Sequence, residues 1–178
     1  MFNGSKIKLA VSTGLAAAGL GIAALAAVPA YAVLTSPGTT TANVGVANTI
    51  TLSGLTAAFT LSGAPATTQT GLTAVTMNVK SDNRTGYNVT VQAAAATMAG
   101  ATIGNLDTIP VSALTVRNTT TGGAYTAIST LSAATVANSA VRSPVGGDTI
   151  NNDYQVVIPW VNADTYSVTL NYLASNNP

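Results

Sequence analysis

The chain has 178 residues, of which only 6% are charged, and it contains no histidine and no cysteine. Glutamate is also absent, so the commonest general bases, thiol nucleophiles and transition-metal ligands are missing, and a serine-histidine-aspartate site is excluded. After residue 32 the five aspartates outnumber four basic side chains, which leaves no basic stripe for a nucleic-acid backbone. We therefore expect a protein that is not an enzyme and that is stabilised by a packed core rather than by disulfides.

The first 32 residues have the pattern of an export signal. Lys6 and Lys8 precede an uncharged run of Ala, Leu, Gly and Val over residues 9–28, and Ala30 and Ala32 supply the small residues that a signal peptidase inspects. Cleavage after Ala32 predicts an extracellular protein without a membrane span. An uncleaved anchor is the alternative, because the apolar run is about long enough to cross a bilayer. The expected organisation is a signal peptide, 1–32, a flexible Thr-rich segment, 33–46, and a single domain, 47–178.

Two-residue alternation of apolar and polar side chains recurs after residue 50, which is typical of strands with one buried face. The first such stretch is LTAAFTLSG, residues 55–63. The next two, residues 75–79 and 87–93, are separated by the turn residues 81–86 and predict a β-hairpin.

Further along the chain, residues 114–116 lead into a Gly122-Gly123 pair, which permits the positive φ of a tight turn and predicts a second hairpin. Residues 136–153 are polar and Gly-rich and predict a long surface loop, whereas residues 166–172 alternate again. The pattern as a whole favours an all-β fold, an antiparallel β-sandwich with Greek-key or Ig-like character preceded by an N-terminal signal helix. A closed barrel is the competing architecture.

The predicted loop also holds the best candidate for a metal site. Oxygen ligands there suit calcium, although their spacing differs from that of an EF-hand and clustered Asp and Asn side chains are common in turns. Calcium is the only cofactor that the sequence suggests, and its candidate ligands are Asp148, Asn151, Asn152 and Asp153.

Two segments together resemble a known family. VKSDNRTGYNVTVQA, residues 79–93, places a turn rich in Asp, Asn and Arg between two strands, and TYSVTLNYLASNNP, residues 165–178, is a Tyr-led strand that ends a few residues later at a proline. They resemble, in order, the two conserved regions of WxL-type cell-surface domains. Where that family has Trp-x-Leu, this chain has Tyr87-Asn88-Val89 and Tyr172-Leu173-Ala174.

The resemblance implies an exported β-sandwich held non-covalently at the cell wall, with the aromatic motifs contributing to peptidoglycan attachment. Tyr87 and Tyr172 are the ligand-binding candidates that it suggests, because a tyrosine ring can stack on a sugar. The alternative is that both rings belong to the core, since each shares a strand face with aliphatic residues. Asp82 and Arg84 are the polar contacts that we expect if the turn between residues 81 and 86 faces a ligand.

Two functions of different classes follow. The first is a secreted, non-enzymatic cell-surface protein, associated non-covalently with cell-wall polymer or with other surface proteins. The second is a structural subunit of an extracellular fibre or biofilm matrix, a homo-oligomer that assembles by β-strand exchange. A segment 33–52 that folds into its own sheet would argue against strand exchange, and an exposed groove near Tyr87 or Tyr172 would favour wall binding.

Overall fold

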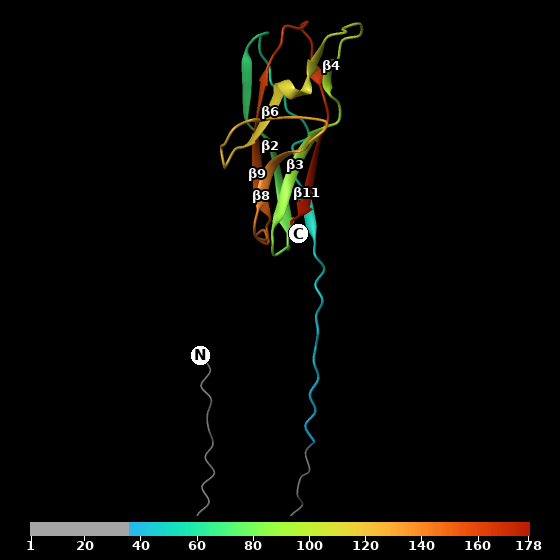
Figure 1. The fold of residues 1–178 in the computed structure, drawn as a ribbon, viewed down its shortest axis with the longest axis vertical. Helices are drawn as coiled ribbons and strands as arrows, with labels where there is room; N and C mark the ends of the chain where they lie inside the picture. The colour runs from blue at the N-terminus through green and yellow to red at the C-terminus, as the bar shows by residue number, and fades with distance from the viewer. Residues whose placement is uncertain (1–35) are drawn as a thin grey trace, which may run out of the picture. The chain divides into compact units, whose positions relative to one another are not determined.

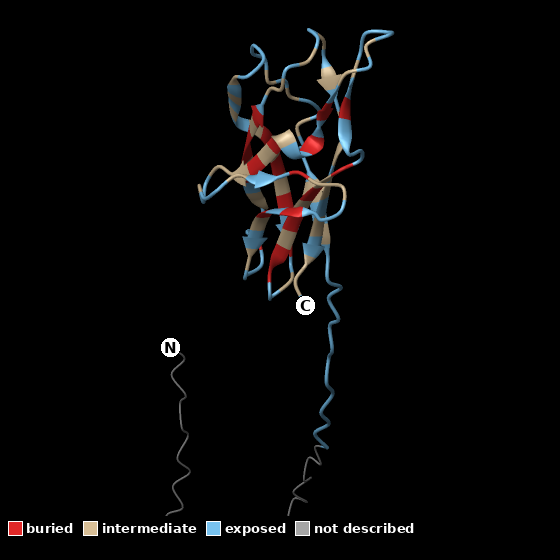
Figure 2. Ribbon diagram, turned by 45° about the horizontal axis from the view of Figure 1, so that its top comes forward, coloured by how far each residue is buried: buried red, intermediate tan, exposed pale blue. Residues whose placement is uncertain are grey.

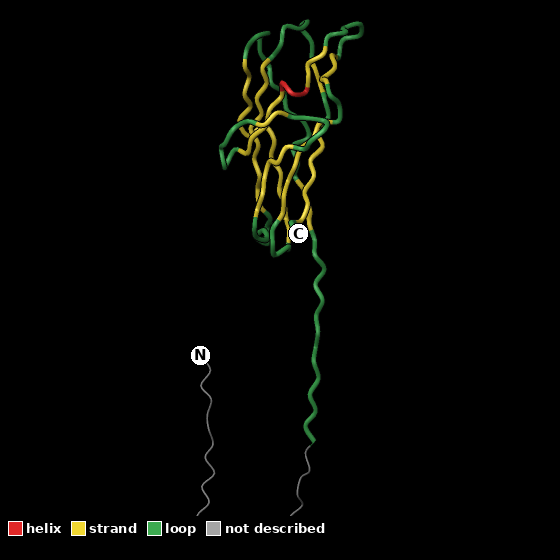
Figure 3. The backbone as a smooth tube through the Cα atoms, viewed as in Figure 1, coloured by secondary structure: helices red, strands yellow, loops and turns green. Residues whose placement is uncertain are grey.

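A computed structural model describes residues 36–178, so the expected signal peptide, residues 1–32, lies outside the described residues. Strands joined by loops and turns make up most of the described chain, as Figure 3 shows. The only helical element among residues 36–178 is the 3-10 turn η1, Val111–Ala113. The strands are β1 (Ile50–Ser53), β2 (Thr68–Ser81), β3 (Tyr87–Ala93), β4 (Thr97–Gly100), β5 (Thr108–Pro110), β6 (Leu114–Asn118), β7 (Thr126–Ala127), β8 (Ala134–Ser139), β9 (Asp148–Val157), β10 (Tyr166–Ser167) and β11 (Leu170–Asn176).

The largest sheet has five antiparallel strands in the order β1-β2-β9-β6-β7. Its centre is formed by the long strands β2 and β9 (Figure 1). The side chains of β2 alternate between buried and more exposed positions over residues 75–81, whereas β9 buries three consecutive residues, 152–154. The register of β2 on β9 shifts between Gly71 and Val75, where a bulge interrupts the ladder. Within this bulge Thr73 has a φ of 52°, a left-handed conformation that is uncommon for a β-branched residue.

A three-stranded antiparallel sheet, β11-β3-β8, supplies the second layer, and β10-β4-β5 form a small third sheet. Alternate residues of β3 are buried, and Figure 2 shows that the buried residues of the unit 44–178 lie mostly on the strands. The core is aliphatic with two tyrosines and two methionines, and its largest fully buried side chains are Tyr154, Met77 and Ile128. This arrangement confirms the all-β antiparallel sandwich. No ladder joins the three sheets into one closed barrel within residues 36–178.

The predicted hairpin of residues 75–79 with residues 87–93 is wrong. These residues belong to β2 and β3, which lie in different sheets and have different partners. The turn between them crosses from one layer to the other, and this crossing lets both apolar faces point into one core. Alternation fixes which face of a strand is buried, but it does not fix the neighbouring strand.

Residues 55–63 form an irregular segment rather than the predicted strand. Phe59 and Leu61 still pack against the core, and the Phe59 ring lies 4.5 Å from the Tyr154 ring between centroids. Backbone pairing is reduced to single contacts, such as the bond from the Thr56 N–H to the Thr76 carbonyl at 3.0 Å. Phe59 and Leu61 are therefore packed against the core without belonging to a strand.

The long loop predicted for residues 136–153 is also wrong, because most of these residues belong to β8 and β9. Asn152 and Asp153 are almost completely buried, and only the residues between Ser139 and Asp148 form a connection outside the strands. The hairpin around Gly122 and Gly123 is confirmed by the pairing of β6 with β7. Residues 166–172 are extended as expected, although they are divided between β10 and β11.

Candidate functional site

Tyr87, the first residue of β3, is a core residue with only 3% of its surface exposed. Its phenol O–H donates to Asp148 Oδ2 at 2.8 Å. Burial is the largest cause that raises the pKa of Tyr87 above its usual value. The hydrogen bond to the Asp148 carboxylate and the charge of that carboxylate raise the pKa further. The ring face is packed against the sandwich, so it offers no flat surface for a sugar to stack on.

Tyr172 lies in the middle of β11, opposite Val91 of β3. It packs against the core, and its hydroxyl shares a hydrogen bond with the hydroxyl of Tyr154. Burial raises the pKa of Tyr172 to about 12, against the smaller opposing effect of that hydrogen bond. Both rings therefore belong to the core, in agreement with the alternative drawn from strand alternation.

The structure brings Asp82 and Arg84 together at one end of the sandwich. Both are exposed and line a depression of about 340 Å³ with Asn83, Arg142 and residues 46–48. Asp82 Oδ1 accepts a hydrogen bond from the Thr49 N–H at 2.7 Å, which anchors the chain just before β1. Tyr87 and Tyr172 do not line this depression.

The four candidate calcium ligands lie along β9 and do not converge. Asp148 and Asp153 are five positions apart on one strand, which corresponds to roughly 16 Å. Asp148 accepts from Tyr87, whereas Asp153 is held in a separate network. Among residues 36–178 there is no group of three or more Asp, Glu, His or Cys side chains placed to hold a metal ion. The calcium site stays a prediction.

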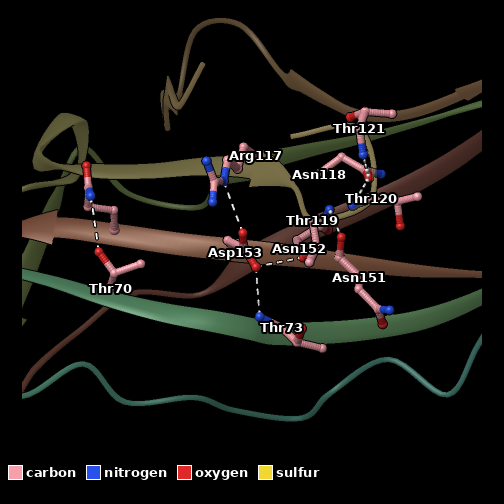
Figure 4. A network of polar contacts seen from close by, with 11 residues as sticks. Thr70, Thr73, Arg117, Asn118, Thr119, Thr120, Thr121, Asn151, Asn152 and Asp153 are labelled. Atoms are coloured by element: carbon pink, nitrogen blue, oxygen red, sulfur yellow. Dashed lines mark hydrogen bonds and ion pairs between the residues drawn. The ribbon is translucent and has the colours of Figure 1, made fainter. Parts of the chain in front are cut away.

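Asp153 is the centre of a buried polar network that joins three strands of the large sheet, shown in Figure 4. Its Oδ1 accepts from the Thr73 N–H at 2.8 Å and from the Thr119 hydroxyl at 2.7 Å, and its Oδ2 pairs with Arg117 Nε at 3.0 Å. Burial alone would raise the pKa of Asp153, but these donors together outweigh it and hold the pKa below its usual value. The carboxylate therefore fixes the bulge of β2 and the start of the β6–β7 turn, which is a structural role.

A groove of about 540 Å³ lies between β8 and the β6–β7 hairpin. Its buried lining includes Val116, Val136 and Ile150, and the hairpin turn contributes Thr120 and Thr121. Sequence reasoning missed this groove, because its walls come from two different sheets and because residues 136–139 of β8 were assigned to a loop. The run NTTTGG at residues 118–123, a polar turn long enough to overhang a neighbouring strand, is the one local signal of it.

Residues 36–49, which precede β1, form no strand. Residues 36–49 are all exposed, and within them Val44 and Val46 have 88% and 84% of their surface exposed. Ala42, Val44 and Val46 alternate with Asn43 and Gly45, which is the pattern of a strand with one apolar face. Only Ile50–Ser53 folds into the chain's own sheet, as β1 on β2.

Comparison with known proteins assigns no relative to the chain: no protein-family model matches it, and no curated protein matches its sequence. Within residues 36–178, no helix is both long enough and apolar enough to span a membrane.

Proposed function

We propose that the chain is an exported, non-enzymatic structural subunit that assembles outside the cell by lending its N-terminal segment to the sheet of a neighbouring copy. The observation that carries this proposal is the exposure of Val44 and Val46 on a segment that has strand-like alternation but no strand partner among residues 36–178. An isolated valine on a surface is ordinary, but two on one face of an unpaired segment leave apolar area and backbone groups that a second chain can satisfy.

The position of the segment supports the same function. It leads directly into β1, and Asp82 holds the Thr49 N–H, so one end of the segment is fixed to the sandwich. Extended at about 3.3 Å per residue, residues 36–49 reach roughly 46 Å, which is ample for a neighbouring copy. β-Strand addition derives its affinity from backbone hydrogen bonds and its specificity from alternate side chains, and this segment offers both.

The test uses protein secreted by an exporting host from the full chain, with its first residue determined by mass spectrometry. Size-exclusion chromatography over a range of concentrations, followed by electron microscopy, is expected to show elongated assemblies of the unaltered protein. The double variant Val44→Asp, Val46→Asp is expected to remain monomeric, because a charge on the apolar face cannot be buried unpaired.

The matched control is Thr41→Asp, Asn43→Asp, which adds the same charge to the opposite face of the same segment. It is expected to assemble. The proposal fails if the unaltered protein stays monomeric at every concentration, or if both double variants assemble as well as the unaltered protein.

Binding of wall polymer is the second candidate function, in line with the resemblance to WxL-type domains. A specific observation favours it: the groove of about 540 Å³ reaches Tyr87 and has hydroxyl and amide groups on its rim. Co-sedimentation with isolated wall sacculi at high salt tests it. Retention should fall in the variant Thr120→Ala, Thr121→Ala, and it should persist in the control Thr39→Ala, Thr40→Ala.

A further inference from the structure

β8 is an outer strand of the three-stranded sheet, and its unpaired edge lies beside the groove. β8 pairs with β3 on one side, and no ladder occupies its other side within residues 36–178. A single side chain reaches that edge from the facing sheet: Asn118 Nδ2 donates to the Val136 carbonyl at 2.8 Å. The edge therefore has backbone groups that, in the described part of the chain, only one side-chain amide covers.

We infer that β8 and its groove are the acceptor for the N-terminal segment of a second copy of this chain, centred on Val44 and Val46. This inference rests on the proposed function and names the surface through which it operates. The lengths are similar, because β8 has six residues and the alternating stretch from Ala42 to Val46 has five. In an added strand the valines face Val116, Val136 and Ile150 in the groove.

The charged residues of the groove are compatible with the N-terminal segment of a second copy as the occupant. Residues 36–49 carry no charged side chain, so covering the groove with them buries no new charge. The two charged residues that line the groove are already engaged: Arg117 pairs with Asp153 and stacks on the Tyr125 ring at 4.6 Å, and Asp148 accepts from Tyr87. An anionic polymer would find no free cation among the lining residues that the structure describes.

The positions of the donor segment and the acceptor edge in the fold allow the contact to repeat from one copy of the chain to the next. The segment leaves from β1, the outer strand of the large sheet on the side of β11, whereas β8 is at the opposite edge of its own sheet. Donor and acceptor are thus different surfaces of one molecule. A head-to-tail contact of this kind continues from copy to copy instead of closing as a symmetric dimer.

The bulge in β8 is expected to limit the pairing of unrelated strands with this edge. The register of β8 on β3 shifts between Val89 and Thr90, so that Val136 is the extra residue, and its carbonyl is the one that Asn118 covers. Bulges and covered carbonyls are ways in which proteins discourage unwanted pairing at a sheet edge. An incoming strand that displaces the Asn118 amide can then form hydrogen bonds with the backbone groups along the edge of β8.

Disulfide trapping tests the inference, because the chain contains no cysteine of its own. Secreted chains with Asn43→Cys or Gly45→Cys, on the face of the segment opposite the valines, are mixed with differently tagged chains with Thr135→Cys or Asn138→Cys, on the outer face of β8, and oxidised with glutathione. All four positions are exposed. The control acceptor is Leu173→Cys on β11, the other edge of the same sheet, where 64% of the residue surface is exposed.

At least one donor-acceptor pair is expected to give about tenfold more mixed disulfide than the Leu173→Cys control, because docking raises the local thiol concentration far above that of random collision. Equal or greater yield with Leu173→Cys, while assemblies still form, overturns the β8 assignment and leaves the proposed function standing. Absence of assemblies refutes both. A double variant Asn43→Cys, Asn138→Cys that closes within one chain also overturns the inference, as does retention on sacculi without any mixed disulfide.

Discussion

Replacement of Asp153 by alanine is the sharpest test of how the sandwich is held together. The carboxylate lies on β9 with a 2% exposed side chain, and it accepts bonds from Arg117, Thr73 and Thr119. Loss of one partner of a buried ion pair typically costs about 3–5 kcal/mol. The Arg117 side chain is 31% exposed and can return to water, so we expect the lower part of that range, about 3 kcal/mol.

Urea unfolding followed by circular dichroism measures this cost. With a slope near 2 kcal/mol per molar urea, a loss of about 3 kcal/mol lowers the midpoint by roughly 1.5 M. Asp153→Asn keeps the shape of the side chain and one oxygen acceptor, so it is expected to cost less, about 1–2 kcal/mol. Asp82→Asn is the control: this exposed carboxylate has one backbone partner, and its replacement should leave the midpoint near that of the unaltered protein.

The pH dependence gives the refuting result. Because the pKa of Asp153 is lower in the folded protein than in the unfolded chain, its stabilisation is present above the ordinary aspartate pKa of about 3.9 and is lost as the pH falls through the folded value. The difference in free energy of unfolding between the unaltered protein and Asp153→Asn should therefore narrow as the pH falls below about 3.9. This account would be refuted by a difference in free energy of unfolding between these two proteins that stays constant from pH 7 to pH 2. A urea midpoint for Asp153→Ala equal to that of the unaltered protein would refute it as well.

Three further predictions concern other parts of the sandwich. Hydrogen bonds from Asn105 and from the Thr102 N–H lower the pKa of Asp164 to about 2, so its carboxyl resonance should titrate near pH 2 and the surrounding loop should keep its amide protection until that pH. Gly86→Ala should lower stability by more than Gly122→Ala: both positions have positive φ, but only at residue 86 would the new Cβ meet a backbone oxygen, that of Ser139, and equal urea midpoints would contradict this. Tyr172→Phe should cost about 1–3 kcal/mol by leaving the buried Tyr154 hydroxyl without its partner, and a thermal midpoint unchanged from that of the unaltered protein would contradict this.

Alternation predicted the buried faces of several strands correctly because it reports a local property. Val75, Met77 and Val79 are all buried, as are Val89 and Val91. Strand partners depend on the whole fold, and the sequence around residues 81–86 does not distinguish a hairpin turn from a crossing between sheets. The partners of β3 are β8 and β11, both far along the chain, and no local signal encodes either pairing.

Buried polar residues caused the largest error. Asn152 and Asp153 looked like loop residues, yet they lie in the centre of the large sheet, because Thr73, Arg117 and Thr119 supply donors that the sequence does not place beside Asp153. The tyrosines of the two segments resembling WxL-type motifs were assigned to the core by alternation and to ligand binding by resemblance. Their burial agrees with the first assignment. The groove beside β8 was beyond sequence reasoning, since it exists only once the two sheets are stacked.

The ties between the last residues and the turn before β3 bear on how the chain folds. Asn83 Nδ2 donates to the Asn177 carbonyl at 2.7 Å across 94 positions of sequence, and the Asn177 N–H donates to the Gly86 carbonyl at 3.0 Å. A sandwich completed by such distant pairings has a high contact order, which slows folding because the loops must close before their contacts form. Folding cannot finish until residue 177 is available. If the chain is exported as proposed, this delay keeps the polypeptide extended for longer, in the state that can be threaded through a membrane channel.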